Sequence, residues 1–210
     1  MKQFTWKAEY SITLIIIFAV FLMLVPTSLG STVQAKFITK WDDCYSKLLY
    51  AKDVISKHEQ EDILKSFKRA KTKNEREDLI LELIKPYYRL NENKFPKPYK
   101  TRFMNKMEVH KDSLYYFKDL YYADNNIIVG LKDISEDKTT EPMFLMMFDM
   151  NGKMPPNTWG KDIFGAQIYE DKVEAFGHNL TLQELQDDCS RIGTGVNCSY
   201  YYQIGGDFAD

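Results

Sequence analysis

The stretch Ile12–Val25 (ITLIIIFAVFLMLV) is almost unbroken apolar sequence, and Thr13 is its only polar residue. Lys2 and Lys7 precede it, and no charged residue occurs over positions 10–35. Such a run predicts a helix in the hydrocarbon core of a membrane, which takes about 20 helical residues to cross. The lysines before it favour an N-terminus on the cytoplasmic side. We therefore expect most of the chain to be exported and tethered to a membrane.

The same segment has a second interpretation, which stays open at this stage. A basic start, an apolar centre and an exit of small residues also describe a secretory signal peptide. Val33-Gln34-Ala35 would then be the cleavage site, and the mature chain would begin at Lys36. Under either interpretation the bulk of the chain leaves the cytoplasm.

Beyond this segment, apolar residues recur at spacings of four and three, the period of a one-sided amphipathic helix. The stripe consists of Val33, Phe37, Trp41, Cys44, Leu48, Ala51 and Ile55. No Gly or Pro interrupts positions 31–61. We predict one helix from about Ala8 to about Lys57, with its first half in lipid and its second half packed on a globular domain.

The N-terminal segment resembles the stem of type IV pilins and of the pseudopilins of type II secretion. The resemblance is carried by Phe4-Thr5, Ala8-Glu9, Ile12-Thr13-Leu14 and Pro26-Thr27, and it covers roughly the first 55 residues. It implies cleavage between Gln3 and Phe4 by a prepilin peptidase, and methylation of the new N-terminus. It also implies that Glu9 pairs with the N-terminal amine of a neighbouring subunit during assembly. The chain departs from the family pattern at Gln3, where the family has Gly or Ala.

The pattern and the resemblance together predict an α+β, pilin-like fold, in which a long N-terminal stem helix packs on a small antiparallel sheet head. Residues 1–30 would form the leader and the transmembrane half of the stem, residues 31–58 its amphipathic half, and residues 59–210 the exported head. The protein would be single-pass in a bacterial inner membrane. Its N-terminus would be cytoplasmic and its head periplasmic or extracellular.

Short apolar or aromatic runs bounded by Asp, Asn, Gly or Pro predict the strands of the head. They lie at 114–117, 126–129, 143–148, 166–169 and 199–204. Residues 181–187 are expected to form one or two helical turns. Helical segments followed by strands indicate an α+β layering with the stem helix on one face of the sheet.

The three cysteines fit an oxidising compartment. Cys189 and Cys198 flank a short segment with two glycines, which lets a loop close, and we predict a disulfide between them; two reduced thiols are the alternative. A bond that closes a loop of this size would stabilise the fold by about 2–3 kcal/mol. Cys44 lies on the amphipathic stripe and is expected to be a buried thiol.

Asp149-Met-Asn-Gly152, followed by Asn157, Gly160 and Asp162, is the densest local motif of the head. The Asn-Gly pair favours a tight turn. Asp and Asn oxygens gathered on a loop also suit Ca²⁺, which makes Asp149, Asn151 and Asp162 candidate calcium ligands. The turn and the calcium site are both kept as interpretations, and no other cofactor or metal is expected.

The expected function is that of a structural subunit of a pilus-like or pseudopilus fibre, which assembles through its N-terminal helix. Its partners would be other pilin-like subunits, the membrane and a prepilin peptidase. The alternative is a secreted or periplasmic soluble binding protein with a signal peptide that ends at Ala35. Because the formal net charge is −2 and the basic residues at 65–76 suit a solvated helix face, nucleic acid is not an expected partner.

No enzymatic activity is predicted from the sequence. The histidines, at positions 58, 110 and 178, are scattered without metal-ligand spacing. The chain carries no nucleophile elbow, phosphate-binding loop or dinucleotide fingerprint.

Overall fold

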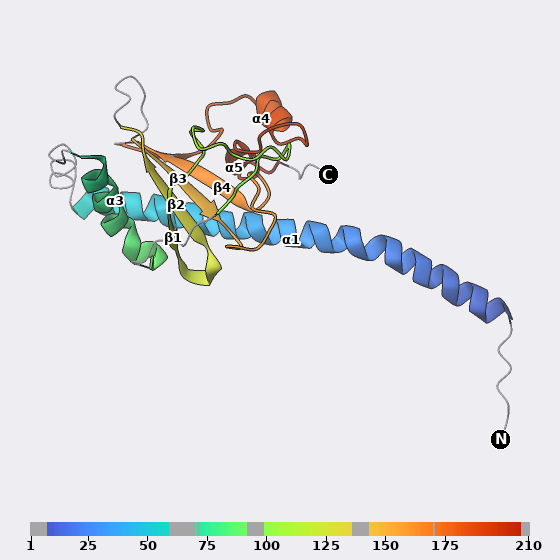
Figure 1. Cartoon of the computed structure of the whole chain (residues 1–210). Helices are drawn as coiled ribbons and strands as arrows, with labels where there is room; N and C mark the ends of the chain where they lie inside the picture. Colours follow the sequence, from blue (N-terminus) through green and yellow to red (C-terminus); the bar gives the residue numbers. More distant parts are fainter. Residues whose placement is uncertain are drawn as a thin grey trace. The chain divides into compact units, whose positions relative to one another are not determined.

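The computed structural model describes residues 8–58, 70, 72–91, 99–135, 143–169 and 171–206, without the side chains of 8, 9, 21–31, 56 and 58. The chain divides into two compact units, Met1–Lys36 and Phe37–Asp210. Helix α1 (Ala8–His58) begins in the first unit and ends in the second. Figure 1 follows the chain from this helix through the sheet to the C-terminal helices.

Helix α1 has the bounds expected from the sequence periodicity, but the transmembrane half predicted for it is wrong. In the part of the chain that the structure describes, no helix combines the length and the apolar character that a membrane span requires. The run Ile12–Val25 has fourteen residues, or about 21 Å of helix at 1.5 Å per residue, against a hydrocarbon core of about 30 Å. This finding contradicts the predicted pilin-like fold class with a transmembrane stem. It also contradicts the prediction of a single-pass protein of the inner membrane.

The second half of α1 buries four of the seven residues of the predicted stripe, whereas Val33 is 48 % exposed. Trp41, Cys44, Leu48 and Ala51 are at most 2 % exposed, because spacings of three and four residues place them on one face of a helix. The indole Nε1 of Trp41 donates a hydrogen bond to the carbonyl oxygen of Ser199 at 2.8 Å. This stripe therefore joins the helix to the C-terminal part of the head.

Helix α3 (Lys73–Tyr88) packs beside the sheet through Ile80, Ile84 and Tyr88. Thr72 begins it with a capping box, in which its hydroxyl accepts from the backbone N–H of Glu75 and the Glu75 carboxylate accepts from the N–H of Thr72. Such a box satisfies two amide groups that the first turn leaves without helical partners. The Tyr88 hydroxyl donates to the carbonyl oxygen of Cys44 at 2.7 Å and so ties α3 to α1.

The head is built on a five-stranded antiparallel sheet whose spatial order follows the sequence, β1-β2-β3-β4-β5. Its strands are β1 (Asp119–Tyr122), β2 (Ile128–Asp133), β3 (Phe144–Asp149), β4 (Ile163–Ile168) and β5 (Val173–Ala175). A 3-10 turn, η1 (Asp124–Asn126), connects β1 to β2. Helices α4 (Leu182–Asp188) and α5 (Cys198–Tyr201) follow the sheet.

Both faces of this sheet are covered. In β3, Phe144, Met146 and Phe148 face the cluster that holds α1 and α3, whereas Leu145 and Met147 face a second cluster. Successive strand residues point to opposite faces, so a strand that is buried on both sides reads as a continuous apolar run. The second cluster is completed by the segments around Phe117, Trp159 and Val196, among others.

Three of the five predicted strands overlap β2, β3 and β4, and the predicted turns at 181–187 overlap α4. The other two predictions are wrong. Residues 114–117 lie outside the strands and β1 begins at Asp119. Residues 198–201 form helix α5, because Cys198, Tyr201 and Tyr202 are buried at spacings of three and four rather than two.

Candidate functional site

The first part of α1 carries a set of exposed apolar side chains, which we call the apolar helix segment (residues 10–20). Between 50 % and 68 % of each of the following is exposed: Tyr10, Ile12, Leu14, Ile15, Ile16, Ile17, Phe18 and Val20. Because consecutive helical residues point about 100° apart, the run from Leu14 to Phe18 is apolar on every side. A monomeric protein rarely exposes so large a continuous apolar surface, and such a surface marks an interaction site.

Two residues of the predicted processing site, Gln3 and Phe4, lie outside the described residues. Glu9 belongs to helix α1, but its side chain is not among those that the structure describes. Its role in assembly and the cleavage before Phe4 stay predictions.

The predicted disulfide between Cys189 and Cys198 is present, with 5.4 Å between the two Cα atoms. Sequence reasoning missed the residue that organises the enclosed loop, Asp188. One carboxylate oxygen of Asp188 accepts from the N–H and hydroxyl of Thr194, at 2.8 and 2.6 Å, and the other accepts from the backbone and side-chain N–H groups of Asn197, at 2.9 and 3.0 Å. Cys44 is a buried free thiol as predicted, and burial raises its pKa to about 12.

The three candidate calcium ligands lie together in a buried loop. Asp149 and Asp162 are 0 % exposed and Asn151 is 8 % exposed. Asp149 accepts from the N–H groups of Asn151 and Gly152 with one oxygen and from the Tyr99 hydroxyl with the other. The two oxygens of Asp162 accept from the backbone N–H groups at 157 and 158, at 2.8 and 2.7 Å.

All four carboxylate oxygens thus already accept hydrogen bonds, and three of them accept from backbone N–H groups of turns. Gly152 has φ +72° there, and a Cβ would come within 2.7 Å of the Asn126 carbonyl oxygen, so only glycine fits the turn. Within the described residues, His, Cys, Asp and Glu side chains form no group of three or more that suits a metal. The turn therefore has structural support, and the calcium site stays a prediction.

Burial is the main reason why the pKa values of these two carboxyl groups are raised. It raises the pKa of Asp149 to about 8, with the charge of Asp162 as the second cause. It also raises the pKa of Asp162 to about 6, although hydrogen bonds from the backbone at 158 and 157 oppose this shift. Both shifts have the sign expected when a carboxylate loses its water.

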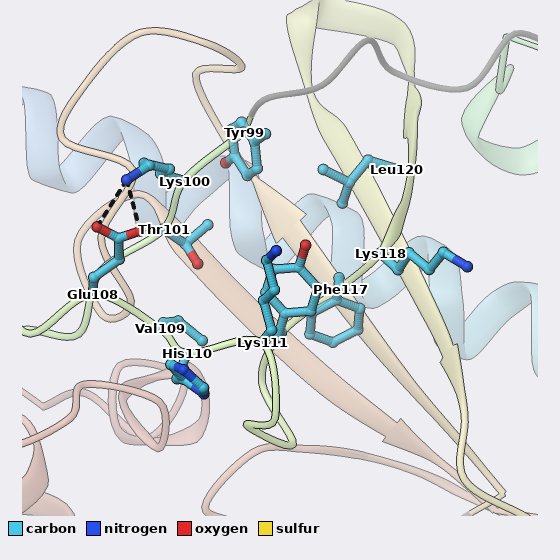
Figure 2. A pocket seen from close by; sticks show the side chains of 11 residues that line it. Tyr99, Lys100, Thr101, Glu108, Val109, His110, Lys111, Phe117, Lys118 and Leu120 are labelled. Atoms are coloured by element: carbon cyan, nitrogen blue, oxygen red, sulfur yellow. Dashed lines mark hydrogen bonds and ion pairs between the residues drawn. The ribbon is translucent and has the colours of Figure 1, made fainter.

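A hollow on the head, which the sequence did not indicate, lies between the segment 99–118 and the start of β1. Its volume is about 540 Å³. In Figure 2 the Lys100 ammonium points toward the Glu108 carboxylate, and the two groups form an ion pair at 2.9 Å. The same view shows Phe117 and Leu120 beside the strands and Lys118 directed outward. The sequence pattern predicted only a strand at 114–117 in this segment, and such a pattern does not indicate a hollow.

Comparisons with known proteins add no relative to these observations. No protein-family model, no curated protein and no solved structure matches the chain. The resemblance to pilin stems therefore depends on the N-terminal sequence pattern alone, and function has to be argued from the structure.

Proposed function

We propose that the protein is a structural subunit of a pilus-like fibre, which assembles when the apolar helix segments of several copies pack against one another. The observation that carries this proposal is the exposure of every described apolar side chain from Ile12 to Phe18. The resemblance of this segment to pilin-type stems supports the same role. The absence of a recognisable catalytic motif in the sequence agrees with a structural role rather than turnover of a substrate.

The energy available for assembly is large. Burying one Leu, Ile or Phe side chain contributes about 1.5–3 kcal/mol. Seven exposed apolar side chains lie between Ile12 and Val20, so contacts between neighbouring helices would exceed the entropy lost on association. The hydrophobic effect needs no directional partner, which allows identical helices to pack side by side.

The test is the size distribution of the purified chain by light scattering and electron microscopy. We expect oligomers or fibres for the natural sequence and monomers for Ile15→Asp/Ile16→Asp, because both residues are exposed and their substitution leaves the head intact. Ile192→Asp is the matched control, since Ile192 is 86 % exposed in the head. A natural chain that stays monomeric at high concentration, or equal dissociation by both changes, would contradict the proposal.

A second candidate is an exported binding protein that is released by cleavage after Ala35. The observation that favours it is the boundary between the two compact units, which falls between Lys36 and Phe37. The buried stripe begins beyond this boundary, so the unit Phe37–Asp210 would keep Trp41, Cys44 and Leu48.

The intact mass of the protein from its native source separates the two candidates. A chain that begins at Lys36 would support the exported binding protein and exclude assembly through the apolar helix segment. A chain that begins at Phe4, especially with a methylated amine, would support the fibre subunit.

A further inference from the structure

The hollow beside β1 has an apolar floor that is formed by side chains of the second core cluster. Phe117, Leu120 and Val109 line it and are each at most 6 % exposed. Phe117 is fixed against Gly130 of β2, where an added Cβ would meet its ring at 3.0 Å. The floor of the hollow is therefore part of the packed second core cluster.

Hydrogen bonds hold the walls of this hollow in place. The N–H of Val109 donates to the carbonyl oxygen of Thr101 at 3.0 Å. Lys132 donates to the carbonyl oxygens of Ser113 and Leu114, at 3.0 and 2.8 Å, and so holds the loop at the far end. A pre-formed hollow loses little entropy when a ligand binds.

The rim of the hollow is positively charged. Lys111 and Lys118 are exposed on it, and within the described residues neither forms an ion pair. Lys100 is the third cation, and Glu108, its partner, is the one acidic side chain among the described residues of the lining. Figure 2 shows Lys111 extending over the region of Phe117. Cations at the rim and apolar side chains at the floor are complementary to a ligand that joins an anionic group to an apolar group.

A second hollow of about 430 Å³ shares Tyr99 and Lys100 with the first and adds Arg102 and Lys153. Among the described residues, the two hollows together gather five cationic side chains and one acidic one, in a chain whose formal net charge is −2. Clustered charge of one sign in a concave surface focuses the electrostatic potential and raises the local concentration of the opposite ion.

We propose that the hollow beside β1 binds a small organic anion, a carboxylate or sulfonate that is joined to an aromatic or aliphatic group. The apolar part lies on Phe117 and Leu120, and the anionic group lies beside Lys111 at the cationic rim. The volume of about 540 Å³ is in the range of small-molecule sites, about 300–1,000 Å³. This site goes beyond the proposed function and does not depend on assembly of the helix.

The test is equilibrium dialysis of the full chain with naphthalene-2-sulfonate, and with naphthalene-2-methanol as the uncharged counterpart. We expect the sulfonate to bind more tightly than the alcohol. Lys111→Glu/Lys118→Glu should weaken sulfonate binding by about tenfold or more, since two nearby charges change sign. Glu108→Gln should tighten it, because Lys100 then loses its acidic competitor.

Two further variants separate this site from other effects. Lys36→Glu/Lys161→Glu makes the same change in net charge at exposed residues that do not line the hollow and should leave sulfonate binding within about twofold, because exposed charges outside the site are screened. Ile15→Asp/Ile16→Asp should also leave it unchanged, which excludes the apolar helix segment as the binding surface. Equal weakening in the two lysine variants, equal binding of the two probes, or no binding at millimolar sulfonate would overturn the proposal.

Discussion

Helix α1 contains two apolar regions that differ in how their side chains are arranged and in what covers them. Between Trp41 and Ala51 the large apolar residues recur at three and four positions, and the structure buries them almost completely. Between Leu14 and Val20 the apolar residues are consecutive, and at least half of each large side chain is exposed. A one-sided stripe is typical of a helix that packs on its own domain, whereas an exposed apolar surface of this size marks an interaction site.

The largest expected effect comes from exchanging a large aromatic residue in each region for alanine. Trp41→Ala should lower the free energy of unfolding by about 3–5 kcal/mol, because it empties a fully buried site and removes the hydrogen bond to Ser199. Phe18→Ala should change it by less than about 0.5 kcal/mol, as for other exposed positions.

Urea unfolding followed by circular dichroism at low protein concentration measures both values. Similar losses for the two variants would mean that the apolar helix segment is covered within the monomer. That result would remove the contrast between the two regions and with it the main argument for assembly.

A smaller effect is expected from the disulfide that anchors the buried half of α1. Ser199, which accepts from Trp41, follows Cys198 directly. Cys189→Ser/Cys198→Ser should reduce the free energy of unfolding by about 2–3 kcal/mol, since the bond closes a short loop in the unfolded chain. Self-association should be unaffected, and light scattering of the variant checks this. Loss of assembly would show that the head, rather than the apolar helix segment, makes the contacts between copies.

The smallest effect is expected on the solvated face of the same helix. Lys47 and Asp43 form an exposed ion pair at 2.7 Å, four residues apart. Lys47→Ala should cost about 0.3–0.5 kcal/mol, the typical value for an exposed pair of this spacing, and the loss should shrink in high salt. A loss of several kcal/mol in the same urea assay would mean that this face is also an interface.

The sequence was most informative where one physical requirement governed several residues. The stripe from Trp41 to Leu48, the strand β3 and the pair Cys189–Cys198 were all predictable, because helix period, burial on both sheet faces and loop closure each leave a pattern. Helix α5 was mistaken for a strand, because three consecutive tyrosines carry no period of their own. The membrane span was overestimated, because the uncharged positions 10–35 were counted toward the length of about 20 residues that a span requires, whereas the strongly apolar run has only fourteen.

The candidate sites also differ in whether they leave a pattern in the sequence. The apolar helix segment was visible as composition, although its exposure was not. The loop of Asp149 and Asp162 was recognised, but only the fold shows that both carboxyl groups are buried and hydrogen-bonded. The hollow beside β1 could not be predicted, because Lys100, Lys111 and Lys118 are brought to one rim by irregular backbone.

The buried acids at Asp149 and Asp162 give the head a thermodynamic property that none of its contacts shows directly: folding takes up protons. An unfolded Asp has a pKa of about 3.9, whereas the folded values are about 8 and about 6. Because the folded pKa values are raised, this contribution to stability is fully present below pH ~4 and is lost as pH rises toward ~8.

At pH 7 the folding reaction therefore draws protons from its buffer. We expect the calorimetric enthalpy of unfolding at that pH to depend on the ionisation enthalpy of the buffer, and to do so less in Asp149→Asn. The same enthalpy in phosphate and in Tris would contradict this expectation. The apolar stretch Ile12–Val20 has no titratable side chain. A change of pH would therefore alter the stability of the head without altering the surface through which copies associate.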